Sequence, residues 1–198
     1  MQKKLNLENP RSYTEKLQWL KLYDRDPLYT TLVDKYAVRE YVANKIGREH
    51  LVPLYGVFNT FDEIDWDKLP NEFIMKCTHG CGFNIICNYK SSFDFARAKK
   101  CFNKWLSINP YWATREWPYK NVKPRIIIEK LLKNNTNLPV DYKFYCFHGK
   151  PYYCRLQFIY QGTKYQNYLD MDFRDTGVRD EVYPPHDNYI PRKSKCYE

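Results

Sequence analysis

The sequence predicts an α+β fold, in which helices near the N-terminus precede strands that pair in an antiparallel manner. Helical periodicity dominates the first third of the chain, whereas strand patterns separated by turns dominate the remainder. Hydrophobic residues make up 43% of the 198 residues, which is sufficient for a packed core. Because helices and strands are largely segregated along the chain, an α+β arrangement is favoured over alternating βαβ units.

Two helices are expected near the N-terminus. Ser12 and Glu15 have the spacing of a capping box, in which the serine caps the helix and the glutamate reaches back to the backbone. Apolar residues at helical spacing follow this pattern: Tyr13, Leu17 and Leu20. A second helix is expected to begin at Asp34, a good N-cap, and to end at Gly47, which suits the left-handed conformation of a C-terminal cap.

Strand patterns follow these helices. A short strand is expected within residues 51–58. Residues 73–77 and 84–87 are apolar runs that flank a turn of small residues at 78–82, and such a pattern is typical of a hairpin. Three consecutive isoleucines within residues 125–129 give the strongest strand signal in the chain, because β-branched residues favour a buried strand.

One further helix and a second set of strands complete the predicted elements. Ser91 and Ser92 are suited to cap a helix, and its apolar face repeats every 3.6 residues: Phe95, Ala98, Phe102, Trp105 and Leu106. Residues 108–124 are expected to be irregular, and the Asn- and Thr-rich residues 134–137 to form a loop. Alternating patterns predict a long hairpin of residues 140–147 and 151–160, and one more short strand near Tyr168.

The formal net charge of +9 favours anionic partners such as nucleotides, acidic polysaccharide, anionic lipid or nucleic acid. The 32 basic residues are spread along the chain without a block of five or more, so a solvated surface explains the charge equally well. A nucleic-acid binder, with aromatic residues that stack on bases, is a further alternative. No recognised nucleic-acid motif supports it, and nucleic acid is therefore not the expected partner.

The chain is expected to be cytoplasmic, because it has neither an apolar run of the length that a membrane helix needs nor a signal-peptide core. Its seven cysteines are an odd number, which favours free thiols. Cys77, His79 and Cys81 lie close together and permit a zinc hypothesis. No second Cys/His pair with finger-like spacing follows them, so free thiols are the expectation.

Four short features could carry chemistry. Lys76 ends a predicted strand just before Gly80 and Gly82, where a lysine and exposed backbone N–H groups can hold phosphate oxygens. Lys35 stands at a predicted helix start, which favours anions. The third feature is residues 129–132, a strand end that can present backbone groups to an adenine edge beside two leucines.

The fourth feature is a pair of residues, Asp141 and Lys143, which alternate onto one face of a strand. They suit either a surface ion pair or a carboxylate and an ammonium aimed into a cleft. Each of the four features also has an ordinary explanation as a solvated side chain or as a strand end. Their order along the chain is therefore more informative than any one of them.

That order resembles the ATP-grasp superfamily. Within it, the stretches 9–21, 34–42, 76–80 and 141–150 resemble the TupA-like family of teichuronopeptide synthesis, whose members accompany genes for capsule or cell-wall polysaccharide. The resemblance covers residues 8–195. It implies an ATP-grasp-like fold with an N-terminal helical lobe (1–70), a nucleotide-binding lobe with the lysine and glycine hairpin (71–133), and the start of a C-terminal antiparallel lobe (134–198).

The resemblance also implies roles for individual residues. Lys35 and Lys76 would hold the phosphates of ATP beside the turn that contains His79, Gly80 and Gly82. A hinge of Glu129, Lys130, Leu131 and Leu132 would bind adenine and the nearby ribose. Asp141 and Lys143 would line the cleft.

The activity implied by the resemblance is that of a carboxylate–amine ligase. Such an enzyme uses ATP to activate a carboxylate as an acyl phosphate, which an amine then attacks. The expected acceptor is an acidic precursor of a surface polysaccharide, and the expected location is the cytoplasm, at the inner face of the membrane beside polysaccharide-synthesis enzymes. Related proteins are often labelled glycosyltransferases, so a transferase is the alternative; the sequence Asp170-Met171-Asp172 has the form that a metal-dependent transferase needs.

Mg²⁺ is expected for the family, whose ligands lie on late strands of the C-terminal lobe. Asp170 and Asp172 are expected to be strand-end or turn residues, so no metal ligand is assigned in this chain. The sequence ends at Glu198, and we expect it to stop before the metal-binding end of the site, which leaves open whether the chain is active.

Overall fold

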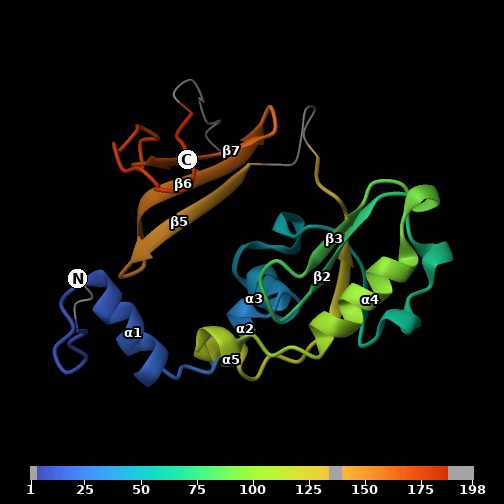
Figure 1. Ribbon diagram of the computed structural model, residues 1–198, viewed down its shortest axis with the longest axis horizontal. Coiled ribbons are helices and arrows are strands. Elements are labelled where there is room, and N and C mark those ends of the chain that lie inside the picture. Colours follow the sequence, from blue (N-terminus) through green and yellow to red (C-terminus); the bar gives the residue numbers. More distant parts are fainter. Residues whose placement is uncertain (1–3, 134–139, 187–198) are drawn as a thin grey trace. The chain divides into compact units, whose positions relative to one another are not determined.

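The computed structural model of the protein describes residues 4–133 and 140–186 (Figure 1). The chain divides into two compact units, a larger unit of residues 1–131 and a smaller unit of residues 132–198. Each unit has its own antiparallel sheet, which confirms the α+β class. The three-lobe division remains a prediction, and residues 134–137, the predicted loop, lie outside the described residues.

The helices of the described residues all lie in the larger unit. Short 3₁₀ turns, which connect elements rather than form them, occur at Arg48–His50, Phe61–Glu63, Trp66–Lys68, Lys90–Ser92 and Trp117–Tyr119. The α-helices are α1 (Tyr13–Tyr23), α2 (Leu28–Val33), α3 (Ala37–Ile46), α4 (Phe95–Leu106) and α5 (Tyr111–Thr114). The sequence patterns did not predict α2 or α5.

The capping box of α1 is confirmed. The Ser12 hydroxyl accepts the amide of Glu15 at 3.3 Å, and the Glu15 carboxylate accepts the amide of Ser12 at 2.9 Å. The same carboxylate accepts the amides of Asn6 and Arg11. These backbone donors, Ser12 foremost, lower the pKa of Glu15 to about 2, because they stabilise its charged form.

Two predicted helix starts are wrong. Asp34 is not the N-cap of α3, because the unpredicted helix α2 ends there and α3 begins at Ala37. Its carboxylate nevertheless accepts the amides of Tyr36 and Ala37 at the start of the helix. Ser91 and Ser92 do not cap α4, because they lie in a 3₁₀ turn; Asp94 is the cap and accepts the amide of Arg97 at 2.9 Å. The predicted end of α3 at Gly47, which has a φ of 99°, is confirmed.

The sheet of the larger unit contains four strands in the order β1-β4-β2-β3, with all neighbours antiparallel. Strand β1 comes from the segment assigned to the N-terminal lobe, yet it pairs with β4. The predicted strands within residues 51–58, 73–77, 84–87 and 125–129 are all present. The first and the last of them are shorter than predicted. The four strands are β1 (Leu54–Phe58), β2 (Phe73–Cys77), β3 (Asn84–Cys87) and β4 (Ile126–Glu129).

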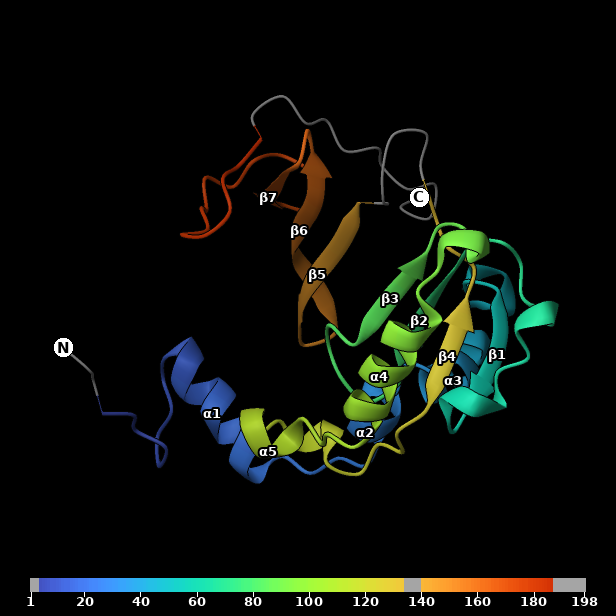
Figure 2. The ribbon, with the colours of Figure 1, turned by 45° about the vertical axis from the view of Figure 1, so that its right-hand side comes forward.

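The two faces of this sheet have different characters. One face packs against α4 and forms the main core, to which Phe73, Met75 and Phe102 contribute fully buried side chains. Because side chains alternate along a strand, Lys76 and Glu129 point to the opposite face. Figure 2 shows α4 in front of β2 and β3, with α3 behind β4.

The smaller unit contains a three-stranded sheet in the order β5-β6-β7, and all of its neighbours are antiparallel. The predicted long hairpin and the strand near Tyr168 are confirmed. His148 and Gly149 both have positive φ, which closes the first hairpin with a tight turn. A small core of Cys154, Leu156 and Leu169 lies on one face of the sheet. The strands are β5 (Asp141–Phe147), β6 (Lys150–Tyr160) and β7 (Thr163–Leu169).

The main core predicts the effect of a truncation in α4. Phe102 is fully buried and contacts the rings of Phe61 and Trp105. Replacing Phe102 with alanine should lower the free energy of unfolding by about 3–5 kcal/mol, because it removes apolar contacts and leaves a cavity. Urea denaturation measures this change. Asn103→Ala, an exposed position on the same helix, should change it by less than about 0.5 kcal/mol; equal effects would contradict the packing described here.

Candidate functional site

The centre of the candidate site is a buried carboxylate held between two cations. The side chain of Glu129 is only 7% exposed. Its Oε1 lies 2.7 Å from Nη1 of Arg39, and its Oε2 lies 2.8 Å from Nζ of Lys76. A buried carboxylate without a partner costs several kcal/mol, and the contacts with both cations offset that cost.

The antiparallel register explains why these side chains meet. Ile127 of β4 stands opposite Lys76 of β2, and Glu129 stands opposite Ile74, so Lys76 and Glu129 are diagonal neighbours on one face of the sheet. Arg39 comes from α3 on that side. Its second guanidinium nitrogen donates to the carbonyl of Val52 at 2.6 Å, which holds the guanidinium in place.

Lys35 is tied to the turn after β2 at two points. Its backbone amide donates to the carbonyl of Thr78 at 3.2 Å, and its Nζ donates to the carbonyl of Gly80. Burial lowers the pKa of Lys35, and the ammonium of Lys76 lowers it further by repulsion. The predicted phosphate lysines are therefore near one another, on the same side of the sheet and beside the same turn.

Asp34 and Arg125 fix the backbone on either side of Lys35. Oδ2 of Asp34 lies 2.7 Å from Nη2 of Arg125, and the Arg125 guanidinium stacks over the ring of Tyr36 at 4.6 Å from its centroid. The Asp34 side chain is 7% exposed and that of Arg125 19%, so this pair is mostly shielded from water. Since Lys35 lies between Asp34 and Tyr36, the pair holds the start of the Lys35 segment against the strand that leads into β4.

The turn that follows Lys76 has glycines for two different reasons. A Cβ on Gly80 would lie 2.9 Å from the ring of Phe83, so that ring requires a glycine at this point. Gly82 has a φ of +76°, which favours glycine, and a Cβ there would meet no atom within 4 Å. The turn is thus packed on its Gly80 side and open at Gly82, where a ligand has room to approach the backbone.

His79 anchors this turn to α4. The side chain is buried, and Nε2 lies 3.0 Å from the carbonyl oxygen of Trp105. Because a carbonyl accepts, Nε2 is the ring nitrogen that carries hydrogen. Burial lowers the pKa of His79, which favours the neutral ring. Its observed contact is structural, and a direct role in nucleotide binding stays a prediction.

The predicted hinge continues directly from Glu129. The amide of Lys130 donates to the carbonyl of Pro53 at 2.9 Å, while Leu131 is buried. Leu132 is 44% exposed and is the first residue of the smaller unit. The larger unit therefore brings together Lys35, Lys76, the turn and the first part of the hinge.

Asp141 and Lys143 lie on β5 of the smaller unit. Nζ of Lys143 is 3.2 Å from Oδ2 of Asp141 and 2.9 Å from Oε1 of Gln157. The side chains of Asp141 and Lys143 are 64% and 41% exposed, so water screens this ion pair. Such pairs contribute about 0–1 kcal/mol. The two residues do share one face, as the alternation predicts, and their place in a nucleotide cleft stays a prediction.

The described residues contain no group of three or more His, Cys, Asp or Glu side chains that could hold a metal ion. Oδ1 of Asp170 accepts the amides of Asp172 and Arg174, and the carboxylate of Asp172 pairs with the side chain of Arg174. These aspartates therefore have the roles of turn residues. The Cys77 thiol is buried, which raises its pKa to about 12, whereas Cys81 is exposed with its Sγ 3.6 Å from Oη of Tyr119.

Two site residues were absent from the sequence prediction. Arg39 neutralises Glu129, and Arg125 pairs with Asp34. One signal could have found Arg39: it follows Lys35 by four residues at the start of a predicted helix, so both side chains can share a face. Its contact with Glu129 depends on the packing of α3 against β4, which no local pattern encodes.

Comparison with known proteins identifies one family. Residues 15–191 match the family described as TupA-like ATPgrasp. No curated protein and no solved structure matches the chain significantly. Within residues 4–133 and 140–186, every helix is too short or too polar for a membrane crossing.

The charge arrangement around Glu129 predicts unequal effects of two arginine truncations. Arg39→Ala should lower the free energy of unfolding by about 2–4 kcal/mol, because it leaves a buried carboxylate with one cation and frees the Val52 carbonyl. Arg48→Ala removes an exposed ion pair with Glu40 and should cost less than about 1 kcal/mol. Urea denaturation of both variants measures the difference. Similar losses for both would show that Glu129 does not depend on Arg39.

Proposed function

The chain belongs to the TupA-like ATP-grasp family, and from that premise we propose that its larger unit binds the phosphates of ATP between Lys35, Lys76 and the turn at residues 78–82. The observation that carries this proposal is the convergence of two lysines on one glycine turn. Partly buried ammonium groups attract phosphate more strongly than fully solvated ones, because water screens them less. The open backbone at Gly82 adds room for N–H groups to approach the ligand.

Lys76 has to exchange one anion for another when a phosphate binds. In the structure its ammonium is paired with Glu129, whose other oxygen is paired with Arg39. When Lys76 turns toward a phosphate, Arg39 remains as a counter-ion, so the carboxylate is not left buried and unpaired. Arg39 thus reduces the cost of releasing Lys76, and we expect it to act as a positioning residue without contact to the nucleotide.

The adenine ring is assigned to the hinge at residues 129–132. This segment leaves β4 beside the lysines, and it contributes one buried and one exposed leucine. An apolar surface at the end of a strand suits the flat adenine ring. In this scheme Glu129 pairs with Lys76 and Arg39 before the nucleotide binds. It contacts the ribose only after Lys76 has moved.

For the reaction, we propose ATP-dependent ligation of a carboxylate to an amine. The carboxylate oxygen attacks the γ-phosphorus, the bond to the β-phosphate oxygen breaks, and ADP leaves. The amine then attacks the carbonyl carbon of the acyl phosphate, inorganic phosphate leaves, and the amine loses a proton. Lys35 and Lys76 would compensate the charge on the phosphate oxygens during transfer. An acidic precursor of a surface polysaccharide, handled in the cytoplasm, is the acceptor that we propose, and the net charge of +9 suits it.

Magnesium is expected for ATP-grasp enzymes, but the donors present in the described residues do not fit it. The described residues contain no group of three or more His, Cys, Asp or Glu side chains that could hold a metal ion. Asp170 accepts a backbone amide of its turn, and Asp172 pairs with Arg174. The same geometry gives no support to the alternative of a metal-dependent glycosyltransferase.

Calorimetric titration with ATP tests the proposed phosphate site. Lys76→Ala should weaken ATP binding about tenfold or more, because one partly buried cation is lost. Lys68→Ala is the matched control: Lys68 is also a lysine of the larger unit that pairs with a carboxylate, but it is solvent-exposed. ATP binding that Lys76→Ala leaves unchanged would contradict the proposed site. Binding of a nucleotide sugar in preference to ATP would favour the transferase instead.

Cysteine alkylation offers a second test that needs no activity. Cys81 is exposed within the proposed phosphate turn, whereas the buried Cys77 thiol has a pKa of about 12 and stays protonated at neutral pH. Iodoacetamide should therefore modify Cys81 well before Cys77, and saturating ATP should slow modification of Cys81 several-fold. Peptide mass mapping measures both rates, and exposed Cys146 of the smaller unit is the internal control. Equal slowing at Cys81 and Cys146 would show that the effect is not local.

A further inference from the structure

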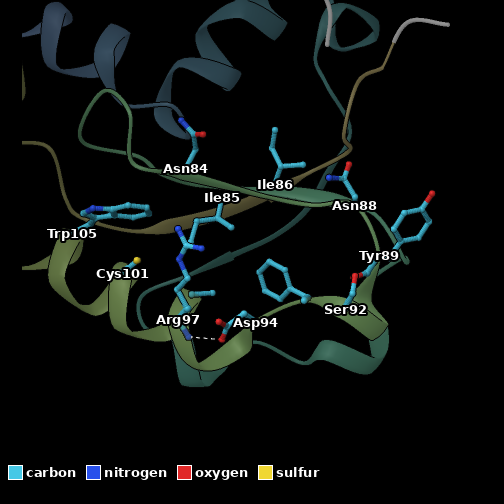
Figure 3. A pocket seen from close by; sticks show the side chains of 12 residues that line it. Asn84, Ile85, Ile86, Asn88, Tyr89, Ser92, Asp94, Arg97, Cys101 and Trp105 are labelled. Atoms are coloured by element: carbon cyan, nitrogen blue, oxygen red, sulfur yellow. Dashed lines mark hydrogen bonds between the residues drawn. The ribbon is translucent and has the colours of Figure 1, made fainter. Parts of the chain in front are cut away.

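A groove lies between strand β3 and helix α4 in the larger unit (Figure 3). Its volume is about 490 Å³. The apolar residues of its lining include Ile85, Phe93, Ala98 and Trp105, which also touch or belong to the main core. In Figure 3 the side chain of Arg97 rises from α4 toward Ile85, so a guanidinium lies beside this apolar surface.

The strand that borders the groove has a free edge. Strand β3 pairs with β2 and with no other strand of the described residues. Lys76 stands opposite Asn84, so the register continued by one residue places Cys77 opposite Phe83, and the amide of Cys77 donates to the carbonyl of Phe83 at 2.8 Å. Hydrogen bonding alternates along an antiparallel pair, so Ile85 and Cys87 also direct their backbone groups to β2, and Ile86 directs its N–H and C=O outward.

An outward amide and carbonyl next to an apolar groove can accept an extended peptide as one more strand. Such a peptide would bond to the backbone of Ile86 and place every second side chain over the groove. Helix α4 and the residues just before it supply the other wall, so these side chains would lie against Phe93 and Trp105. The backbone geometry therefore favours a peptide over a sugar chain, which has no regular set of amides to continue the sheet.

Helix α4 is basic, and two charged residues line the groove itself: Arg97 and Asp94, which caps the helix. Helix α4 contains four basic side chains and no acidic one: Arg97, Lys99, Lys100 and Lys104. Lys100 and Lys104 follow Arg97 by three and seven positions, so the three share one side of the helix, and Arg97 is the one that lines the groove. None of these three forms an ion pair with another residue in the described part of the chain. Lys99 points elsewhere and pairs with Asp62 at 2.5 Å.

We propose that the groove between β3 and α4 binds an extended, acidic peptide segment of a partner protein, which adds to the free edge of β3. Apolar side chains of the segment would fill the groove, and its carboxylates would meet Arg97, Lys100 and Lys104. The site lies on the α4 face of the sheet, whereas Lys76 and Glu129 face the other way. The peptide and the nucleotide would therefore contact opposite faces of the sheet.

The test uses a fluorescein-labelled peptide, Glu-Thr-Val-Thr-Glu-Thr-Val-Thr-Glu, and the full chain. Its odd positions place valine and glutamate on one face of an extended strand. Two control peptides have the same sequence with N-methyl groups at alternate residues, one at the odd positions and one at the even positions. Each keeps the charge and the side chains, but each blocks strand pairing along one of the two edges of the peptide. Fluorescence anisotropy should show binding of the parent peptide and loss of binding for one of the two methylated forms.

Charge reversal locates the site. Arg97→Glu and Lys104→Glu should each weaken peptide binding about three- to tenfold, because they replace attraction with repulsion at an exposed position. Lys99→Glu changes the same charge on another side of α4 and should leave binding nearly unchanged. Hydrogen exchange gives a direct readout: the amide of Ile86 should exchange more slowly when the peptide is bound.

Several outcomes would overturn the proposal. The first is no binding of the parent peptide at millimolar concentration, and the second is equal binding of both methylated forms. Equal effects of the three charge reversals would show non-specific attraction to a basic surface. Displacement of the peptide by a polygalacturonate oligosaccharide that binds more tightly would assign the groove to an acidic glycan instead. ATP titration of Arg97→Glu separates the sites, since its ATP affinity should equal that of the unaltered chain.

Discussion

The buried charge of Glu129 is the constraint on which the candidate site depends. A carboxylate that is 7% exposed requires cations within direct contact, and the fold supplies one from a helix and one from a strand. Arg39 joins α3 to the end of β4, and Lys76 joins β2 to the same point. The ion pairs of Glu129 thus hold α3, β2 and β4 together. They also hold Lys76, the lysine that we assign to phosphate, in position before a ligand binds.

The opposite face of the same sheet forms the main core of the larger unit. It is apolar, and its packing against α4 gives the larger unit its stability through buried aromatic and aliphatic side chains. His79 crosses from the turn beside the lysines to the C-terminal end of α4, where it contacts the Trp105 carbonyl. The sheet can therefore present a charged face to a nucleotide while the core on its other side keeps the turn in place.

Both proposed sites use groups that the fold leaves incompletely paired. The ammonium groups of Lys35 and Lys76 each donate to one oxygen within the described residues, although an ammonium has three donors. The outward backbone of β3 has no strand to pair with in the same part of the chain. One site suits a phosphate and the other suits a peptide, because the first offers ammonium groups near an open turn and the second offers amides beside an apolar groove. An ATP-grasp protein with a peptide groove on its far face could act on its substrate while it is attached to a partner.

The sequence by itself determined the class of fold, most strands, the capping box, and the family to which the chain belongs, because periodicity, turn residues and ordered motifs are local properties. It also identified the lysines, the glycine turn and Glu129 as candidates. Only the tertiary structure decided that Arg39 neutralises Glu129, that the carboxylate of Asp34 pairs with Arg125, and that β1 joins the sheet of β2. These contacts join residues that are distant in the chain, and their energies depend on burial and register, which exist only after the sheet has formed.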